Sequence, residues 1–457
     1  MIVMKFGGSS LESPEAVQRV CGIIQSRLAQ SPLVVVSAHG STTNRLLATA
    51  QAARHGNREE MEALAQELRH YHHSLATGLL TAERLSLATQ IIDQNFDELL
   101  EVLRGVTVLG ELTPRTIDTV MSFGERSSSQ VVALALQELG IAGKAFDARR
   151  YLVTDERHTQ AQPDFPATFE RLAVLKAELG DGVVPVMGGF IGSTTEDATS
   201  TLGRGGSDFS ASIFGAGIDA EEIQIWTDVD GVLTSDPRVI ANVHRLKNIS
   251  FAEASELAYF GAKVLHPATL LPAVQKGIPV RVLNSRRPQV EGTLIVAEVA
   301  PCRNPVKAIA CKRNITVVNI HSTRMLMAYG FLRRIFEVFD RYETPVDIVC
   351  TSEVSVSLTL DTTTRLKEIV EELERFSTVT TECNQGVIAV VGESIRHTPG
   401  IGGRALWALN NINIRMISQG ASLLNLSLVV ADDQLQVAMQ ALHDEFFRDL
   451  DPEVFAQ

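Results

Sequence analysis

The residues best suited to chemistry stand together at Leu202–Asp208, which reads Leu-Gly-Arg-Gly-Gly-Ser-Asp. The glycines let backbone N–H groups approach an anion closely, and the helix predicted after Asp208 would direct its positive end to the same point. Arg204 adds a bidentate donor, Ser207 a hydroxyl and Asp208 a carboxylate. This combination suits a site that holds a phosphate and a small carboxylate together, as phosphate transfer to a small acid requires.

A second glycine turn, Gly7-Gly8, follows Lys5 in the first predicted strand. The lysine would point its ammonium at a cleft, while the glycine amides face phosphate. Because the lysine precedes the glycines, this is not a Walker loop. Such a turn can also be purely structural, but the loop at Leu202–Asp208 favours a functional role.

Three further segments are open to more than one interpretation. Ser37–Asn44 could hold the phosphate or the acceptor, or be a plain polar loop. Phe123–Arg126 is expected to open a helix, where Glu125 either stabilises the helix N-terminus or binds a substrate ammonium. The acidic loop from Asp228 to Arg238 lacks the spacing and glutamate of a calcium-binding EF-hand, which favours nucleotide contact. We expect no metal ion held by protein side chains.

The composition restricts the class of protein. A chain of 457 residues with 45% apolar residues predicts two or three domains of an α/β enzyme. The net charge of −13 argues against nucleic acid or an anionic membrane as partner. No apolar run approaches the roughly 20 residues that span a bilayer, and the chain starts directly with a strand-like segment rather than a signal peptide. The five widely spaced cysteines indicate reduced thiols, so we expect a cytoplasmic protein.

The first two-thirds of the chain alternates predicted strands with predicted helices. This alternation predicts a largely parallel sheet covered by helices on both faces, with ligands at the carboxyl ends of the strands. The predicted strands are Ile2–Phe6, Leu33–Ser37, Val183–Met187 and Ile223–Trp226, and the predicted helices are Glu15–Leu28, Glu59–Leu75 and Ser127–Leu139.

Beyond Pro301–Pro305 the pattern changes to two similar units, offset by about 70 residues. Each reads β-α-β-β-α-β. The predicted strands Val354–Leu360 and Leu424–Val430, in which apolar and polar residues alternate, stand in corresponding places. A repeated small sandwich at the end of an enzyme indicates a ligand sensor. The alternative is a pair of modules that only dimerise.

Five segments of the chain, taken in order, resemble those of the aspartate kinases of the amino-acid kinase family. The matching segments are Lys5–Gly8, Phe123–Glu125, Leu202–Asp208, Trp226–Asp228 with Thr234–Arg238, and Gly261–Pro267. The repeated tail resembles the ACT units of the same enzymes, and Thr351–Val356 with Met325 and Gly330–Leu332 looks most like the lysine-inhibited, monofunctional type. We therefore expect no homoserine dehydrogenase part.

The resemblance implies a three-layer αβα amino-acid kinase domain over residues 1–300 and a regulatory region over 301–457. The regulatory region would hold two ferredoxin-like ACT units, at about 313–382 and 383–457. It would mediate a homodimer, with a tetramer as the alternative. The implied reaction converts ATP and L-aspartate to ADP and 4-phospho-L-aspartate with Mg²⁺, in lysine, threonine and methionine biosynthesis. L-lysine would inhibit it.

The resemblance also implies roles for individual residues. Lys5 would stabilise the transferring phosphoryl group, and Asp208 would orient Lys5. The acceptor pocket would comprise Thr43, Glu125, Arg204, Gly205, Gly206 and Ser207. ATP would contact Lys5, Gly7, Gly8, Ser9, Thr227, Asp228, Leu233, Arg238, Lys263 and Val264. The effector lysine would contact Met325, Ala328, Phe331, Leu332, Pro345, Val346, Asp347, Ser352 and Glu353.

Departures from the family pattern are small: Ser9 stands where threonine is common, and His39 and Leu233 are unexpected. One rival function is a kinase for glutamate, acetylglutamate or carbamate, against which stand Phe123–Glu125 and the repeated tail. An inactive amino-acid sensor would be expected to lack Lys5, Arg204 or Asp208. A nicotinamide dehydrogenase is disfavoured because no G-x-G-x-x-G turn follows the first strand.

Overall fold

The computed structural model describes residues 1–180, 182–261, 267–300, 302–323 and 329–456. Contacts divide the chain into two compact units. The first comprises Met1–Val232 and Leu265–Glu298, and the second comprises Leu233–Val264 and Val299–Gln457. The domain limits 1–300 and 301–457 stay a prediction. Among the helices that are described, none is long and apolar enough to cross a membrane.

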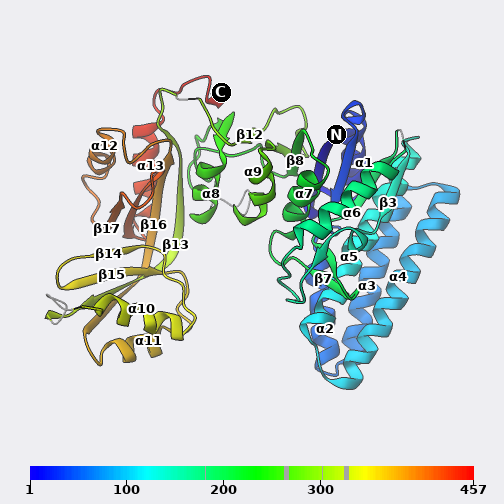
Figure 1. Ribbon diagram of the computed structural model, residues 1–457, viewed down its shortest axis with the longest axis horizontal. Coiled ribbons are helices and arrows are strands. Elements are labelled where there is room, and N and C mark those ends of the chain that lie inside the picture. The colour runs from blue at the N-terminus through cyan, green and yellow to red at the C-terminus, as the bar shows by residue number, and fades with distance from the viewer. Residues whose placement is uncertain (181, 262–266, 301, 324–328, 457) are drawn as a thin grey trace. The chain divides into compact units, whose positions relative to one another are not determined.

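The first unit is built of alternating strands and helices (Figure 1). Its elements are β1 (Ile2–Phe6), α1 (Pro14–Gln25), β2 (Pro32–Val36), α2 (Thr42–Arg54), α3 (Arg58–Leu79), α4 (Ala82–Leu109), α5 (Pro114–Glu138), β3 (Gly143–Phe146), β4 (Val153–Thr154), α6 (Phe165–Glu178), β5 (Val184–Gly188), β6 (Ile191–Thr194), β7 (Thr199–Thr201), α7 (Gly206–Gly217), β8 (Glu222–Thr227), α9 (Leu271–Lys276), β11 (Val280–Asn284) and β12 (Thr293–Val296).

The main sheet of this unit has the strand order β12-β11-β8-β1-β2-β5-β3. Neighbouring strands are parallel, except for the antiparallel pair of β11 and β12. Strands β4, β6 and β7 form a smaller sheet. The largely parallel sheet and all four predicted strands are confirmed.

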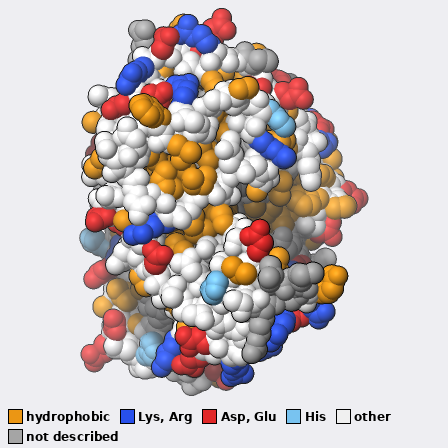
Figure 2. All heavy atoms as spheres, turned by 90° about the vertical axis from the view of Figure 1, so that its left-hand side faces the viewer, with side chains coloured by type: hydrophobic (Ala, Val, Ile, Leu, Met, Phe, Trp, Pro, Cys, Tyr) orange, Lys and Arg blue, Asp and Glu red, His pale blue; other side chains and the backbone are white. Residues whose placement is uncertain are grey.

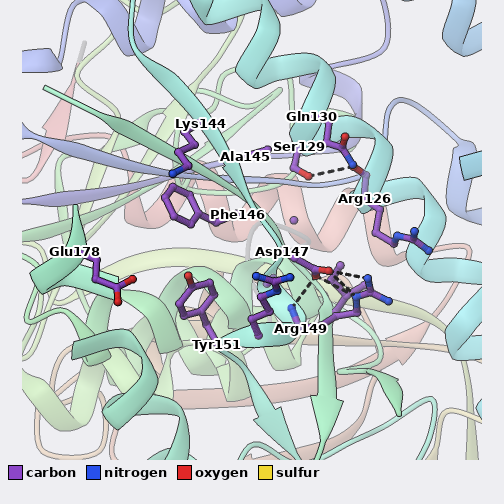
Figure 3. A pocket seen from close by; sticks show the side chains of 14 residues that line it. Arg126, Ser129, Gln130, Lys144, Ala145, Phe146, Asp147, Arg149, Tyr151 and Glu178 are labelled. Carbon is purple, nitrogen blue, oxygen red and sulfur yellow. Dashed lines mark hydrogen bonds and ion pairs between the residues drawn. The ribbon is translucent and has the colours of Figure 1, made fainter. Parts of the chain in front are cut away.

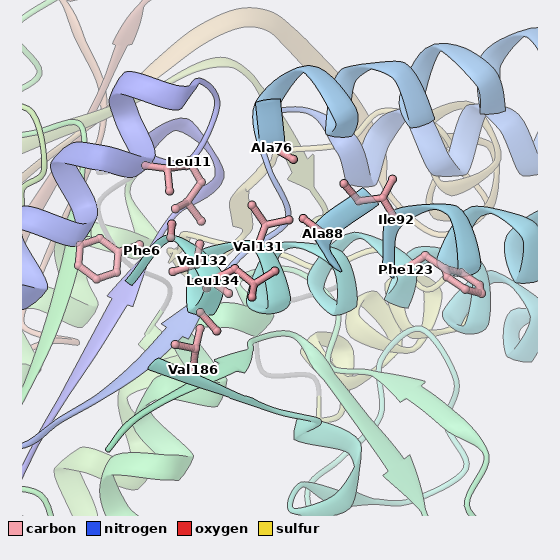
Figure 4. Packing of buried hydrophobic residues seen from close by; sticks show 14 of the residues in the cluster. Phe6, Leu11, Ala76, Ala88, Ile92, Phe123, Val131, Val132, Leu134 and Val186 are labelled. Atoms are coloured by element: carbon pink, nitrogen blue, oxygen red, sulfur yellow. The ribbon is translucent and has the colours of Figure 1, made fainter. Parts of the chain in front are cut away.

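Alternation along β1 separates the core from the site. Met4 and Phe6 pack into a hydrophobic cluster with helices α1 to α5, and Figure 4 shows Phe6, Val132 and Val186 in this cluster. Successive side chains of a strand point to opposite faces of the sheet. Lys5 therefore lies on the other face, where it contacts the first turn of α7.

Helix α5 begins earlier than the sequence pattern predicted. Phe123–Arg126 does not open a helix, because α5 starts at Pro114. The Thr113 side chain accepts a hydrogen bond from the Thr116 N–H, and proline occupies the first turn, so both N-terminal signals favour the earlier start. Glu125 consequently lies in the interior of a long helix rather than at its N-terminus.

The second unit contains a six-stranded sheet with the order β14-β15-β13-β16-β18-β17. A short antiparallel pair, β9 with β19, is also present. The elements of the second unit are β9 (Arg245–Leu246), β10 (Asn248–Ser250), α8 (Phe251–Tyr259), β13 (Val306–His321), α10 (Phe331–Arg341), β14 (Val349–Thr351), β15 (Ser355–Leu360), α11 (Leu366–Leu373), β16 (Thr378–Gly392), α12 (Ile401–Ala408), β17 (Ile414–Gln419), β18 (Asn425–Ala431), α13 (Leu435–Phe446) and β19 (Phe455–Ala456).

Two long strands serve both ACT-like halves of this sheet. The last part of β13 pairs with β15 and with the first part of β16. The first part of β13, from Val306 to Lys312, pairs with the last part of β16, which also pairs with β18. The second half therefore takes its final strand from residues that precede the first half in the chain, an exchange that the sequence pattern did not reveal.

Candidate active site

One cavity in the first unit, of about 570 Å³, collects side chains from strand ends, glycine loops and helix α5. Among its lining residues are all those predicted for phosphoryl transfer and acceptor binding: Lys5, Thr43, Glu125, Arg204, Gly205, Gly206, Ser207 and Asp208. These residues are distant in sequence, and the parallel sheet brings them to one place.

Lys5 and Asp208 form an ion pair in this cavity. The distance from Lys5 Nζ to Asp208 Oδ1 is 2.6 Å, and the two side chains are 10% and 17% exposed. Asp208 lies in the first turn of α7, whose N-cap Gly205 has a φ of 73°. The positive end of α7 and the ammonium of Lys5 therefore both favour an anion in the cavity.

Glu125 is a buried carboxyl with one unused oxygen. Its Oε1 accepts a hydrogen bond of 3.1 Å from the Ala38 N–H. Its Oε2 has no hydrogen-bond partner within the described part of the chain. Burial raises the pKa of Glu125 to about 8, so the side chain is mostly protonated at neutral pH until a cation joins it. A substrate ammonium at Oε2 would restore the carboxylate.

The glycine turns pack backbone against backbone, which excludes any side chain. A Cβ on Gly8 would lie 2.7 Å from the Gly40 carbonyl oxygen, and a Cβ on Gly189 would lie 2.8 Å from Ser207 Cα. Contacts this close are possible only for glycine. The turn after β1 can therefore hold its amides against a phosphate.

The residues predicted to contact ATP divide between the two units. Gly7, Gly8 and Ser9 follow β1, while Thr227 ends the neighbouring parallel strand β8 and is followed by Asp228. Leu233 and Arg238 belong to the second unit, where Arg238 is exposed and pairs with Asp236 at 2.5 Å. Lys263 and Val264 lie outside the described residues.

Asp347, one of the residues predicted to bind an effector, has polar contacts on one of its carboxyl oxygens. The Tyr259 hydroxyl donates a hydrogen bond to its Oδ1, and Lys312 Nζ lies 3.8 Å from the same oxygen. Its Oδ2 is buried and has no hydrogen-bond partner in the described ranges. Burial raises the pKa of Asp347. The unused oxygen of this carboxyl could accept a hydrogen bond from a ligand.

The other described residues predicted for the effector lie around the first half of the sheet. Phe331 is buried at the start of α10, whereas Leu332 is exposed there. Pro345 and Val346 precede Asp347. Ser352 and Glu353 form an exposed turn between β14 and β15, and Met325 and Ala328 lie outside the described residues.

Several residues that the sequence pattern did not single out also line the active-site cavity, among them Thr159 and Phe190. Thr159 and Phe190 both have left-handed backbone, with φ of 71° and 66°. The preceding Gly188-Gly189 turn was a signal for Phe190. The sequence around Thr159 holds no comparable signal, and the Thr159 N–H donates to Asp118 on the distant helix α5.

A second cavity, of about 550 Å³, lies at the end of β3 (Figure 3). Lys144, Arg149, Tyr151 and Glu178 line it, and Arg149 pairs with Asp147 at 2.6 Å. None of the predicted site residues belongs to its lining. The residues expected to transfer the phosphoryl group and to bind the acceptor line the first cavity instead.

Comparisons with known proteins identify the family of the chain and its fold. The profile of the amino acid kinase family matches residues 1–284, and that of the ACT domain matches residues 388–446. Lysine-sensitive aspartokinase 3 of Escherichia coli is 38% identical over 464 residues, which cover 98% of this chain and 99% of the relative.

Two solved structures of E. coli aspartokinase III share the fold. The complex with aspartate and ADP, in the R-state, has a TM-score of 0.83, 35% identity and coverage of 98% and 100%. The complex with lysine and aspartate, in the T-state, has a TM-score of 0.82, 35% identity and coverage of 98% and 99%. The chain therefore belongs to the aspartokinases, the aspartate kinases of the amino acid kinase family, and carries their ACT domains.

Proposed function

We propose that this chain transfers the γ-phosphoryl group of ATP to the side-chain carboxylate of L-aspartate. The observation that carries the proposal is the joint presence of the Lys5–Asp208 pair, Arg204 and the unused Oε2 of Glu125 in one cavity. Arg204 would bind the α-carboxylate of aspartate, and Glu125 its α-ammonium. The side-chain carboxylate would then be the group left to react.

No general base is needed, because a carboxylate with an ordinary pKa of about 3.9 is already ionised at neutral pH. The barrier is the repulsion between the attacking carboxylate and the phosphate, so positioning and positive charge must lower it. Lys5 would supply that charge to the transferring group, held in place by Asp208 at 2.6 Å. The N-terminus of α7 would add its dipole.

The turn after β1 fits a nucleotide, since Gly8 leaves no space for a side chain and its amide can face a phosphate. Gly7, Ser9, Thr227 and Asp228 stand at the ends of two adjacent strands and would complete the contacts to ATP. Mg²⁺ bound with the phosphates of ATP would neutralise part of their charge. The E. coli relative was solved with aspartate and ADP, which supports this assignment.

The test is ADP formation by the purified chain with ATP and Mg²⁺, in parallel with aspartate, glutamate, N-acetylglutamate and carbamate as acceptors. Aspartate alone should support turnover. Turnover with another acceptor in place of aspartate would assign a different amino-acid kinase activity. Absence of turnover with all four would favour the inactive sensor.

We further propose that L-lysine inhibits the reaction by binding at the first ACT-like half. The unused Oδ2 of Asp347 favours an ammonium ligand there, and the E. coli relative was solved with lysine. Lysine, but not threonine, should inhibit the parent chain. Asp347→Asn should lose this inhibition, whereas the exposed Asp340→Asn on α10 should keep it. Inhibition of Asp347→Asn equal to that of the parent would contradict the assignment.

A homodimer through the ACT region is part of this proposal. Figure 2 shows hydrophobic side chains grouped on the face of the second unit that it displays. Val349 of edge strand β14 and Ile417 of edge strand β17 are 37% and 44% exposed. Such apolar side chains at sheet edges favour association with a second copy. The biosynthetic pathway and a cytoplasmic location stay predictions.

A further inference from the structure

We propose that Asp118 is a positioning residue for the acceptor side of the active site. It would fix Thr159 and the turn at Gly203 as the wall of the cavity that receives aspartate. This inference rests on the proposed function, since it concerns how the same cavity binds its acceptor.

Asp118 is fully buried on helix α5, and its carboxyl group has four close polar contacts. The Thr159 N–H donates to both oxygens, each at 3.0 Å. The Thr201 hydroxyl donates to Oδ1 at 2.5 Å, and His158 Nδ1 lies 2.9 Å from Oδ2. One side chain therefore joins helix α5 to the segment at 158–159 and to the end of β7.

Thr159 needs such a contact because its backbone is strained. Its φ of 71° lies in the left-handed region, which β-branched residues rarely adopt. A conformation of this kind persists only where the surroundings hold it in place. The N–H of Thr159 donates to Asp118 from this conformation, so the carboxyl group stabilises the strained state rather than an ordinary one.

The segment with Thr159 packs against the loop that carries Arg204, the residue proposed to bind the α-carboxylate of aspartate. A Cβ on Gly203 would lie 3.0 Å from the Thr159 carbonyl oxygen, so the two backbones are in contact. Thr201, two residues earlier, is held by Asp118 and by a hydrogen bond of 2.9 Å from the Ala161 N–H to its carbonyl. Arg204 directly follows Gly203. Asp118 therefore contacts both the segment that leads to Arg204 and the segment at 158–159 that packs against it.

Asp118 acts on this wall without lining it. Thr159, Thr201, Gly203 and Arg204 all line the cavity, whereas Asp118 does not. Asp118 and Glu125 are seven residues apart on α5, which places them on the same helix face. On that face of α5, Glu125 would contact the acceptor directly, and Asp118 would hold the part of the cavity wall formed by Thr159 and Gly203. Loss of Asp118 should disturb the binding of aspartate more than that of ATP.

The first test is Asp118→Asn, a change that keeps the size of the side chain but replaces one acceptor oxygen with a donor. The KM for aspartate should rise about tenfold or more, while the KM for ATP and kcat stay within about threefold. Asp164→Asn, at the N-cap of α6, is the matched control and should leave both KM values unchanged. A rise of both KM values together would overturn the proposal.

The second test uses Thr159→Gly, because glycine adopts the left-handed region without strain. In the double variant with Asp118→Asn, this change should restore most of the affinity for aspartate. A purely structural role of Asp118 would give no such rescue, and absence of rescue would overturn the proposal. A parent chain without aspartate-dependent turnover would instead refute the proposed function.

If Asp118→Asn fails to fold, His158→Phe removes a single contact from the same carboxyl group. The KM for aspartate should then rise about two- to fivefold, with the KM for ATP unchanged. An unchanged KM for aspartate in this variant would overturn the proposal. His158 does not line the cavity, so the change leaves the direct contacts of the substrate intact.

Discussion

Replacing Glu125 by glutamine is expected to stabilise the first unit while it weakens the binding of aspartate. The buried carboxyl has a pKa of about 8 in the folded chain, against an ordinary value of 4.5. Between these two values the folded chain keeps a proton that the unfolded chain has released. Stability therefore falls as the pH rises from 4.5 to 8. Glutamine is neutral in both states, so it removes this loss.

The size of the effect follows from the two pKa values. The ionisable carboxyl costs about 3 kcal/mol of folding free energy at pH 7, and less than about 1 kcal/mol at pH 5. Glutamine can still accept the hydrogen bond from Ala38 through its carbonyl oxygen. Glu125→Gln should therefore be more stable than the parent by about 3 kcal/mol at pH 7, and by much less at pH 5.

The assay is urea denaturation of both chains at the two pH values, without substrate, followed through the transition of the first unit. Glu101→Gln, an exposed position on α4, is the control and should change stability little at either pH. A Glu125→Gln chain that is no more stable than the parent at pH 7 would refute the reasoning. So would a stabilisation that is the same at pH 5 and pH 7.

Three further predictions concern the proposed active site. The KM for aspartate should fall about fivefold from pH 7 to pH 8, because Glu125 ionises over this range. A KM for aspartate that does not change with pH in the parent chain would contradict the binding of an ammonium at Oε2. Lys5→Ala should lower kcat at least about a hundredfold, with a melting temperature near that of the parent, and near-parental turnover would remove Lys5 from the mechanism. Gly8→Ala should raise the KM for ATP, because its Cβ would meet the Gly40 oxygen at 2.7 Å, and an unchanged value would exclude this turn from the nucleotide site.

The strands and glycine loops could be predicted because they depend on local pattern. β1 has the limits expected from its apolar run. Leu202–Asp208 leads into a helix as predicted, but the helix begins at Gly206 rather than after Asp208. The start of α5 also has a local signal, Thr113-Pro114, but the helix start was predicted at Phe123–Arg126, which includes a glycine at 124. Helix starts depend on capping contacts as much as on periodicity.

Other features depend on contacts between distant parts of the chain. The role of Asp118 is invisible in the sequence, because its partners are 40 or more residues away and one of them adopts a backbone that threonine rarely takes. The strand shared by the two ACT-like halves is equally hidden, since Val306–Lys312 precedes both helices of the first half. The ionisation of Glu125 follows from burial alone, which only the packed structure supplies.

The central claim is that the phosphoryl group reaches the side-chain carboxylate of aspartate. Hydroxylamine traps an acyl phosphate as a hydroxamate, so the chain should be incubated with ATP, Mg²⁺, aspartate and hydroxylamine. The account predicts aspartyl β-hydroxamate in amounts equal to the ADP formed, and neither product from the Lys5→Ala variant. Release of ADP without any hydroxamate, or formation of the α-hydroxamate, would contradict it.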